Sequence, residues 1–554
     1  MRSSTSELTA HLGGELVGPD VSIEGASIDS RAIRPGQLYA PIVAERDGHA
    51  FIAAALEAGA PAYLTAQEPV GGTAIRVRDT AAALLSLGAL ARGRVGGAIG
   101  ITGSVGKTTT KDLLAGCLAS TFRTAASDRS FNNELGLPLT LLNAPDAARW
   151  VVLEMGARRV GDIERLGEVA SPDVGIVTSV DMAHVEYLGD LDGVARAKGE
   201  LVAALPASGV AVLNFDDPRV RDMASLSACP VLGYAVGADD EVRADDITLD
   251  RDLHARFRLS SPWGQTEVRL ALHGVQQIPN ALAAATVALW CGVPIETVAA
   301  ALAVSQGSPW RMEVHHVPGG PVLVVDCFNA IPASAEAAVR SLAALPGERK
   351  LAVLGLMAEL GDQSESEHRR IALVAEELGI DVVGYETALY GEAHVTGVDE
   401  AVALLRTMGS GDAALVKGSR VARLEDVVRA YGKAEGAPSL TPGAGAAALP
   451  YVATPAQGRP EVAPAPHLDR ATRRPQDRRI SSAYRKPHTC WQRHAALTGG
   501  VTYSKPAGTT TGHWQAPAQS RSDATANQPT SPARTTTRQR CTPPVVLQVE
   551  PCWR

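Results

Sequence analysis

Residues 103–109, which read GSVGKTT, combine two glycines, a lysine and two threonines between an apolar run and a segment with helical character. Glycines allow backbone N–H groups to turn toward phosphate oxygens, and the amino end of a helix adds positive potential. Lys107 is suited to bridge the β- and γ-phosphates of a nucleotide, and the Thr108 hydroxyl is suited to bind Mg²⁺. The stretch therefore predicts a site for a nucleoside triphosphate.

The spacing of this loop is a variant of the strict P-loop, because Ile101 and not a glycine lies five residues before Gly106. The Gly-Lys-Thr-Thr end is intact, and it follows a strand pattern and precedes a helix pattern. That context favours phosphate binding over an ordinary glycine turn. We expect these residues to contact the nucleotide: Gly103, Ser104, Val105, Gly106, Lys107, Thr108 and Thr109.

Three more polar residues follow in the chain, and the first has the position of a metal ligand. In VVLEMGA, Glu154 lies at the C-terminal end of a predicted strand, where a P-loop enzyme has its second metal ligand. His184 lies in SVDMAHVEYLG, and Lys198 lies in the helical pattern DGVARAKGEL. A single histidine is more often structural and a single lysine usually faces solvent, so their functional interpretation depends on their combination with the loop.

The elements that must position these residues alternate between apolar runs and helix-like segments over the first 432 residues, a pattern typical of βαβ units around a mainly parallel sheet. The central runs are AIGIT, RWVVLEMGA, VGIVTSV and GVAVLNFDD. A second block contains PVLVVDCFNA, KLAVLGLMA, DVVGY and AALVKGS, and an earlier unit contains AYLTA and AIRVR. We predict an α/β protein with domains at residues 1–90, 91–308 and 309–432.

Composition and charge argue against several classes of protein. The 554 residues carry a net charge of −8, and no apolar run approaches the ~20 residues that span a bilayer. The first residues lack the apolar core of a signal peptide, so we expect a cytoplasmic protein without a nucleic-acid or membrane partner. The scattered Cys117, Cys229, Cys291 and Cys327 form no CxxC pair, and we expect buried, reduced thiols.

The last part of the chain differs in charge and pattern. Residues 451–554 contain fifteen lysines and arginines against five aspartates and glutamates, and they are rich in Pro, Thr, Ala and Gln. Almost no apolar periodicity is present there. We predict that residues 433–554 form a disordered, basic tail, for which a solvated appendage is a simpler interpretation than an RNA-binding or lipid-binding arm.

Several motifs together resemble the Mur ligase family, over about residues 25–430. SIDSRAIRPGQLYAPI and RDGHAFIAAALEAGA are similar to its UDP-sugar-binding domain, and GITGSVGKTTTKDLL is similar to its ATP loop. SFNNELGLPLTLL, LEMGA, the His184 segment and ARAKGEL follow in the order of the family. QIPNALAAATVAL, PWRMEV, VVDCFNAIPAS, AVLGLMAELGDQSESEH and ALVKGSR complete the resemblance. It implies a central P-loop domain and a Rossmann-like C-terminal domain.

As an activity, the resemblance implies ATP-dependent addition of D-alanyl-D-alanine to UDP-N-acetylmuramoyl-tripeptide through an acyl phosphate. Thr108 and Glu154 match the ligands of one Mg²⁺, with Glu154 and His184 near a second. Lys198 matches a lysine that is carbamylated in the family, and Lys107, His184 and Lys198 match the catalytic positions. A carbamate has acceptor oxygens that an ammonium lacks. A monomer is expected.

The resemblance also implies the remaining contacts. Asn280 matches the adenine-side asparagine, Arg311 an arginine that reaches the ATP phosphates, and Asp326 an aspartate near the ribose. The substrate side matches at five positions, although for the first two a capped surface turn is the alternative: Ser30, Arg31, Asn132, Asn133 and Asn329.

Five residues depart from the family pattern, each altering one polar contact: Phe328 for tyrosine, Ile331 for asparagine, Leu356 for an acidic residue, Gln276 for histidine and Ser179 for asparagine. None is a predicted phosphate or metal contact. Two alternatives stay open, namely an amide ligase of the same superfamily that adds a single amino acid, and a nucleotide-binding scaffold that has lost ligation.

Overall fold

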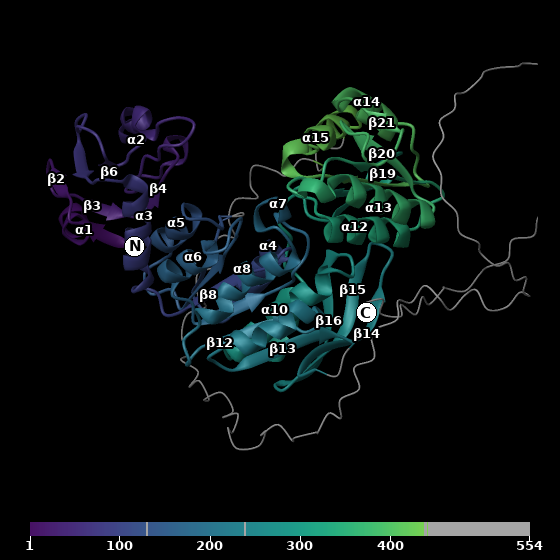
Figure 1. The fold of residues 1–554 in the computed structure, drawn as a ribbon, viewed down its shortest axis with the longest axis horizontal. Helices are drawn as coiled ribbons and strands as arrows, with labels where there is room; N and C mark the ends of the chain where they lie inside the picture. Colours follow the sequence, from purple (N-terminus) through teal and green to yellow (C-terminus); the bar gives the residue numbers. More distant parts are fainter. Residues whose placement is uncertain (129–130, 238–239, 437–439, 441–554) are drawn as a thin grey trace, which may run out of the picture. The chain divides into compact units, whose positions relative to one another are not determined.

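The computed structural model describes residues 1–128, 131–237, 240–436 and 440 (Figure 1). The predicted tail therefore lies almost wholly outside the described residues. Within them the chain forms three main sheets, and we name the surrounding parts the N-terminal lobe (residues 1–92), the central lobe (93–308) and the C-terminal lobe (309–436 and 440).

The N-terminal lobe is built on a five-stranded sheet of order β2-β7-β6-β5-β4, in which β4 to β7 are parallel and β2 is antiparallel to β7. Strands β1 and β3 form a separate, two-stranded antiparallel sheet. The elements are β1 Arg2–Ser4, α1 Thr5–Leu12, β2 Glu15–Val17, β3 Ser22–Glu24, β4 Ala26–Ser27, η1 Ser30–Ala32, β5 Leu38–Tyr39, η2 Gly48–Phe51, α2 Ile52–Glu57, β6 Ala62–Thr65, β7 Thr73–Arg76 and α3 Thr80–Arg92.

The central lobe contains a nine-stranded sheet of order β16-β15-β14-β13-β12-β11-β8-β10-β9, parallel from β9 to β14. Helices α4 and α10 pack on one face and α6 and α8 on the other (Figure 1). The elements are β8 Ala98–Thr102, α4 Lys107–Ala119, β9 Thr124–Ala126, α5 Gly136–Asn143, β10 Trp150–Glu154, α6 Asp162–Ala170, β11 Val174–Val177, α7 Val185–Leu188, α8 Leu191–Ala203, β12 Val210–Asn214, α9 Pro218–Asp222, η3 Met223–Leu226, β13 Val231–Val236, β14 Val242–Leu249, β15 His254–Ser261, β16 Gly264–His273, α10 Gln277–Trp290 and α11 Ile295–Leu302.

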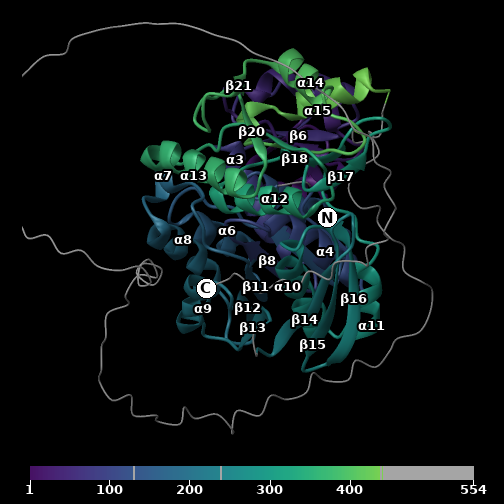
Figure 2. The same ribbon diagram turned by 90° about the vertical axis from the view of Figure 1, so that its right-hand side faces the viewer.

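The C-terminal lobe has a six-stranded sheet of order β17-β18-β22-β19-β20-β21, parallel except for β17. Helices α12 and α13 cover one face and α14 and α15 the other (Figures 1 and 2). The elements are β17 Glu313–His316, β18 Val322–Asp326, α12 Pro332–Ala344, β19 Lys350–Leu354, η4 Gly361–Gln363, α13 Ser364–Glu377, β20 Asp381–Tyr385, β21 His394–Val395, α14 Val398–Leu405, β22 Ala413–Lys417, η5 Arg420–Ala422 and α15 Glu425–Ala434.

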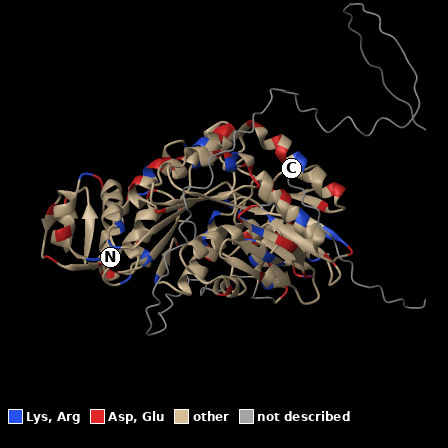
Figure 3. Cartoon of the chain, turned by 90° about the horizontal axis from the view of Figure 1, so that it is seen from below, with Lys and Arg blue, Asp and Glu red and all other residues tan. Residues whose placement is uncertain are grey.

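The α/β prediction is confirmed, and each apolar run singled out in the sequence contains a strand. Most of those strands are largely buried, which accounts for their runs of apolar residues, whereas Lys, Arg, Asp and Glu residues lie mainly on helices and loops (Figure 3). The antiparallel extension β14–β15–β16 was not predicted. Its strands alternate exposed and buried residues instead of forming an apolar run, because helices cover them less completely.

The predicted domain limits stay predictions, and two of them fall within the last turn of a helix. Helix α3 ends at Arg92, two residues beyond the first limit, and the second limit at residue 308 lies between α11 and β17. Helix α15 continues to Ala434, two residues beyond the third. Among the described residues, no helix is both long enough and apolar enough to cross a membrane.

The nine-stranded sheet reverses its winding direction at β8, because β10 joins one side of this strand and β11 the other. In open parallel sheets such a switch point leaves a crevice beyond the carboxyl ends of the strands, where ligands bind. Ile101 of β8 pairs with Glu154 at the end of β10, and Thr102 pairs with Val177 at the end of β11. Three chain segments with predicted site residues therefore leave the sheet at one place.

The contact between α3 and α5 allows a test of the packing, because it depends on Gly88. A Cβ atom at this position would lie 2.5 Å from Pro138 Cβ and 2.8 Å from Pro138 Cα. Alanine normally stabilises a helix by about 1 kcal/mol relative to glycine. We expect Gly88→Ala instead to lower the stability by about 1–3 kcal/mol, because of overpacking against a rigid neighbour.

The matched control is Gly167→Ala in α6, where a Cβ would meet only Ala204 Cβ at the ordinary distance of 3.6 Å. This variant should be neutral or slightly more stable than the parent. Chemical denaturation followed by circular dichroism measures both variants. Equal stabilisation by the two alanines would contradict the packing assigned to Gly88.

Candidate functional site

The loop between β8 and α4 needs glycine at two positions for reasons of both conformation and space. Gly103 has φ 149° and Gly106 has φ 83°, a region that side chains disfavour. A Cβ on Gly103 would lie 1.8 Å from Thr178 Oγ1, and one on Gly106 would lie 2.2 Å from Asn280 Oδ1. The loop is therefore held closely between the segment after β11 and helix α10.

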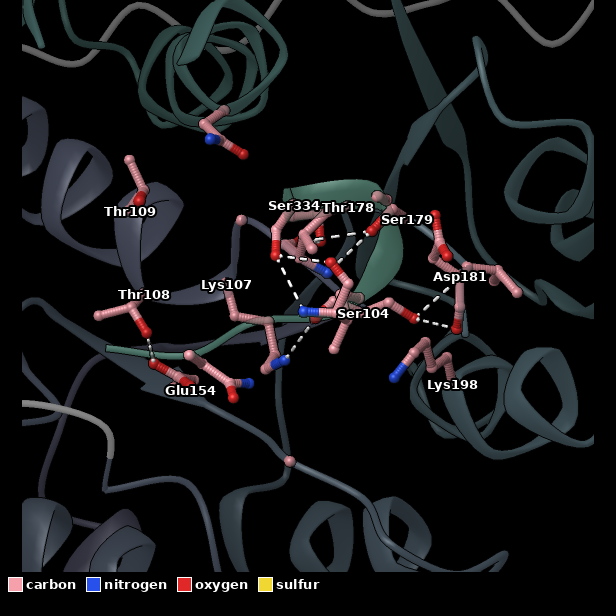
Figure 4. A pocket seen from close by; sticks show the side chains of 18 of the residues that line it. Ser104, Lys107, Thr108, Thr109, Glu154, Thr178, Ser179, Asp181, Lys198 and Ser334 are labelled. Atoms are coloured by element: carbon pink, nitrogen blue, oxygen red, sulfur yellow. Dashed lines mark hydrogen bonds between the residues drawn. The ribbon is translucent and has the colours of Figure 1, made fainter. Parts of the chain in front are cut away.

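The segment after β11 fixes the loop by hydrogen bonds. The N–H of Ser104 donates to the carbonyl of Ser179 at 2.9 Å, and the N–H of Val105 donates to Ser179 Oγ at 3.0 Å. Ser104 Oγ donates to the carbonyl of Asp181 at 3.0 Å, and it accepts the Asp181 N–H at 2.8 Å (Figure 4). Ser179, a departure from the family pattern, therefore supplies the hydroxyl that anchors the loop.

Lys107 begins helix α4 and folds back over the loop. Its Nζ donates to the carbonyl of Gly103 at 2.6 Å and to that of Ser104 at 3.4 Å. Burial lowers the pKa of Lys107, the carboxylate of Glu154 raises it in part, and the charge of Arg311 lowers it. An ammonium group held on backbone carbonyls at the amino end of a helix is well placed to receive phosphate oxygens.

Thr108 and Glu154 form a buried pair. Thr108 Oγ1 donates to Glu154 Oε2 at 2.7 Å, and the other carboxylate oxygen accepts Asn132 Nδ2 at 2.9 Å (Figure 4). Arg311 Nη2 donates to the same Thr108 hydroxyl at 3.0 Å. Hydroxyl and carboxylate oxygens are the donors that Mg²⁺ prefers.

The Thr108 hydroxyl and the Glu154 carboxylate fit Mg²⁺ only together with further ligands. Within the described ranges, no group of three or more His, Cys, Asp or Glu side chains is arranged to hold a metal ion. Mg²⁺ in nucleotide enzymes usually has one or two protein ligands, with substrate phosphates and water for the rest. Thr108 and Glu154 match that pattern.

Lys198 in α8 is 2% exposed, and no hydrogen bond joins its amine to any described residue (Figure 4). Burial lowers the pKa of Lys198 well below its ordinary value, and the charge of Lys107 lowers it further. A buried ammonium without a partner is strongly unfavourable, so the neutral amine is the form that this environment supports.

His184 follows β11 and faces the C-terminal lobe. Its Nδ1 contacts Glu359 Oε2, and its backbone has φ 58°, in the left-handed region. Burial lowers the pKa of His184, whereas the Glu359 carboxylate raises it in part. The neutral imidazole is therefore the favoured form at pH 7 and above.

Arg311 reaches the central lobe from the segment before β17. Its guanidinium lies 4.1 Å from the ring centroid of Phe328. The Nε of Arg311 is buried and has no partner among the described residues. An unused guanidinium donor in a cleft is a binding group for an anion. The ring of Phe328 supports the arginine without the hydroxyl that a tyrosine would carry.

The carboxyl ends of two neighbouring strands meet in the C-terminal lobe as well. Asp326 ends β18 and pairs in register with Lys417, which ends β22. Lys417 Nζ lies 2.5 Å from Asp326 Oδ2 and donates to the carbonyl of Asn329 at 3.0 Å. The other Asp326 oxygen accepts the N–H of Met312 at 3.2 Å.

A cleft of about 1510 Å³ brings most predicted site residues together. These line it: Ser104, Val105, Gly106, Lys107, Thr108, Thr109, Asn132, Asn133, Glu154, His184, Lys198, Asn280, Arg311, Asp326 and Asn329.

Three predicted residues do not line the cleft. Gly103 belongs to the loop but does not line the cleft, and its carbonyl accepts a hydrogen bond from Lys107. Ser30 and Arg31 lie on η1 of the N-terminal lobe, where the exposed Arg31 guanidinium pairs with Asp29 at 2.8 Å. Their predicted contact with substrate stays a prediction.

Sequence reasoning did not single out Glu359 or Lys417 as site residues. Both lie at or shortly after the carboxyl ends of parallel strands, in the segments KLAVLGLMAELG and AALVKGS. The rule that located Glu154 at the end of its strand could therefore have found them.

Comparisons with known proteins agree with this geometry. The family model of the Mur ligase middle domain matches residues 101–288, and that of the Mur ligase glutamate ligase domain matches residues 310–420. The UDP-N-acetylmuramoyl-tripeptide--D-alanyl-D-alanine ligase of Mycobacterium tuberculosis (strain ATCC 25618 / H37Rv) is 38% identical over 497 residues, which covers 76% of this chain and 97% of that protein. The enzyme of the same name from Escherichia coli (strain K12) is 34% identical over 441 residues, covering 77% and 97%.

Solved structures with similar folds include MurF from Acinetobacter baumannii, with a TM-score of 0.71 and 28% identity over 78% of this chain and 99% of that chain. MurF ligase from Thermotoga maritima in complex with ADP has a TM-score of 0.66 and 28% identity, covering 74% and 97%.

Proposed function

This chain belongs to the Mur ligase family of ATP-dependent amide ligases, and we propose that it joins D-alanyl-D-alanine to UDP-N-acetylmuramoyl-tripeptide in peptidoglycan precursor synthesis. The observation that carries the proposal is the cleft in which the glycine loop, Glu154, His184 and Lys198 converge with Arg311. Relatives that bear this activity in their names match the chain over 97% of their length.

The three lobes have separate roles in this proposal. Residues 1–90 bind the UDP-sugar, residues 91–308 bind ATP, and residues 309–432 complete the nucleotide site and receive the amine. The enzyme acts in the cytoplasm as a monomer, with small-molecule substrates and without a nucleic-acid or membrane partner.

A carboxylate is a poor acyl donor, so ligation needs a better leaving group. ATP supplies a phosphoryl group: an oxygen of the terminal carboxylate bonds to the γ-phosphorus as the bond to ADP breaks. The amine of D-alanyl-D-alanine then attacks the acyl carbon, phosphate leaves, and the nitrogen loses a proton to form the amide. The protein contributes mainly by positioning and by neutralising charge.

The residues around the loop act on the phosphates. Lys107 moves from the Gly103 carbonyl to the β- and γ-phosphate oxygens, and Arg311 offers its unused Nε donor from the opposite lobe. Thr108 and Glu154 would hold a first Mg²⁺, and Glu154, His184 and carbamylated Lys198 would hold a second. Mg²⁺ neutralises charge on the transferring group when it is bound.

The remaining residues orient the substrates. Asn280 reads the adenine side, and the Asp326–Lys417 pair holds the carboxylate of Asp326 toward the ribose. On the acyl side, Asn132 already contacts Glu154 and so links the peptide to the metal site. The other proposed substrate contacts are Ser30, Arg31, Asn133 and Asn329.

Carbamylation of Lys198 fits its surroundings. The neutral amine attacks CO₂ and loses one proton, and the product is a carbamate anion with two acceptor oxygens. Burial lowers the pKa of Lys198, so the reactive neutral amine is present above that lowered pKa and is lost as the pH falls through it. The anion also balances the charges of Lys107 and the metal ions.

Phosphate release distinguishes this proposal from its alternatives. UDP-N-acetylmuramoyl-tripeptide, ATP and Mg²⁺ are supplied with D-alanyl-D-alanine or with single amino acids. We expect release with the dipeptide only. Release with a single amino acid would instead support another member of the superfamily, and no release with any acceptor would support a scaffold.

Replacement of Lys107 tests the phosphate assignment. We expect Lys107→Ala to reduce turnover by about 10²-fold or more, since a group that stabilises charge in the transition state is lost. The unfolding midpoint should stay close to that of the parent, because the amine contacts only loop carbonyls. Turnover near the parent value would remove Lys107 from the phosphate site.

Replacement of Lys198 tests the carbamate. We expect Lys198→Ala to be inactive alone and partly active in millimolar acetate or propionate, which place a carboxylate where the carbamate was. Lys107→Ala is the matched control, since an acid cannot replace its cation and should not restore it. If Lys198→Ala keeps parental turnover without added acid, Lys198 does not belong to the site.

A further inference from the structure

Glu359 links the C-terminal lobe to His184, which lines the cleft from the central lobe. It lies in the segment between β19 and η4, and its side chain is 25% exposed. Glu359 Oε2 contacts His184 Nδ1, and Glu359 Oε1 lies 3.4 Å from Arg158 Nη2. The carbonyl of Glu359 also accepts the N–H of Glu186 at 3.3 Å. One residue of the C-terminal lobe is therefore bound by three residues of the central lobe.

The backbone on both sides of this contact is in an unfavourable conformation. Glu359 has φ 62° and His184 has φ 58°, and neither is a glycine. Gly361 has φ 52°, and a Cβ there would lie 3.7 Å from Glu186 Cα, an ordinary contact distance between the two segments. Left-handed non-glycine residues are kept where the surrounding structure needs them, and they concentrate at functional sites.

The two nitrogens of the imidazole ring have different tasks in this arrangement. A neutral histidine carries its proton on one nitrogen only, and the hydrogen bond at one nitrogen decides the state of the other. Because a carboxylate accepts, Glu359 selects the form with the proton on Nδ1. Nε2 then keeps its lone pair, and His184 lines the cleft. Carboxylates in this position also hold the plane of the ring.

We propose that Glu359 is a positioning residue, which couples docking of the C-terminal lobe to the orientation of the His184 ring through a carboxylate–imidazole contact between the lobes. When the lobes separate, the contact is lost and the ring can rotate and exchange its proton between both nitrogens. The effect on catalysis rests on the proposed ligase function, whereas the contact itself does not.

Other partners of Glu359 do not account for its position. Arg158 is 70% exposed and its guanidinium is 3.4 Å away, so this pair contributes little. The Glu186 hydrogen bond uses the backbone carbonyl of Glu359, and a side-chain substitution leaves it in place. A change at Glu359 therefore removes the ring contact while one link between the lobes is kept.

The experiment uses the full chain with ¹⁵N-labelled histidine at pH 8 and reads the tautomer of His184 from the ¹⁵N shifts of its ring. The resonances are assigned by their absence in His184→Asn. In the parent we expect a single form with the proton on Nδ1. Glu359→Ala should give a mixture of both tautomers, and Glu359→Gln should largely restore the parent form, because its amide oxygen still accepts.

A second measurement is the Mg²⁺ dependence of phosphate release. Glu359→Ala should reduce turnover or the apparent Mg²⁺ affinity by about 10–100-fold, as for other residues that hold a metal-binding histidine. The matched control is Glu400→Ala in the same lobe, where the carboxylate contacts only Thr396. This control should resemble the parent in both measurements.

The proposal is overturned if Glu359→Ala keeps the parent tautomer and the parent Mg²⁺ dependence. Should Glu359→Ala fail to fold, Glu359→Asp withdraws the carboxylate by one methylene and carries the same expectations. The tautomer is measured without turnover, so the positioning role of Glu359 and the proposed ligase function can be contradicted independently of each other. An inactive parent with a Glu359-dependent tautomer contradicts the ligase function, whereas an active parent with an independent tautomer contradicts the positioning role.

Discussion

The cleft depends on a geometric constraint of parallel sheets, in which neighbouring strands all end at the same edge. In the central lobe, β8, β10 and β11 deliver the glycine loop, Glu154 and the segment with His184 to one crevice. In the C-terminal lobe, β18, β22 and β19 deliver Asp326, Lys417 and the segment with Glu359 in the same way. Polar groups that are far apart in the sequence therefore meet at one edge of each sheet.

Three buried lysines show how the environment decides what one residue type can do. Lys417 is paired with Asp326 and holds its carboxylate in place. Lys107 is bound to backbone carbonyls, which it can exchange for phosphate oxygens. Lys198 has no partner among the described residues, and burial lowers its pKa well below the ordinary value. Only the third is prepared to react as a neutral amine.

The site also requires both sheets at once. Arg311 of the C-terminal lobe donates to the Thr108 hydroxyl, and Glu359 of the same lobe contacts His184. The C-terminal lobe therefore supplies a polar partner to two side chains of the central lobe. Each contact is made by one side chain, which comes from a connecting segment and not from a helix or strand. In the proposed ligase reaction, contacts of this kind would allow the lobes to open for substrates and to close over them.

From the sequence, the parallel strands that are apolar runs could be located and the glycine loop could be predicted, because a buried run and the Gly-Lys-Thr-Thr end are recognised from local context. Glu154 was also identified, since it directly follows an apolar run. Alternating burial hid the strands β14 to β16, whose residues do not form such a run. The partners of His184 and Arg311, and the lack of a hydrogen-bond partner for Lys198 among the described residues, depend on the tertiary structure. Whether a lysine is neutral, or which nitrogen of a histidine is free, depends on burial and on residues such as Glu359 that lie 175 positions away.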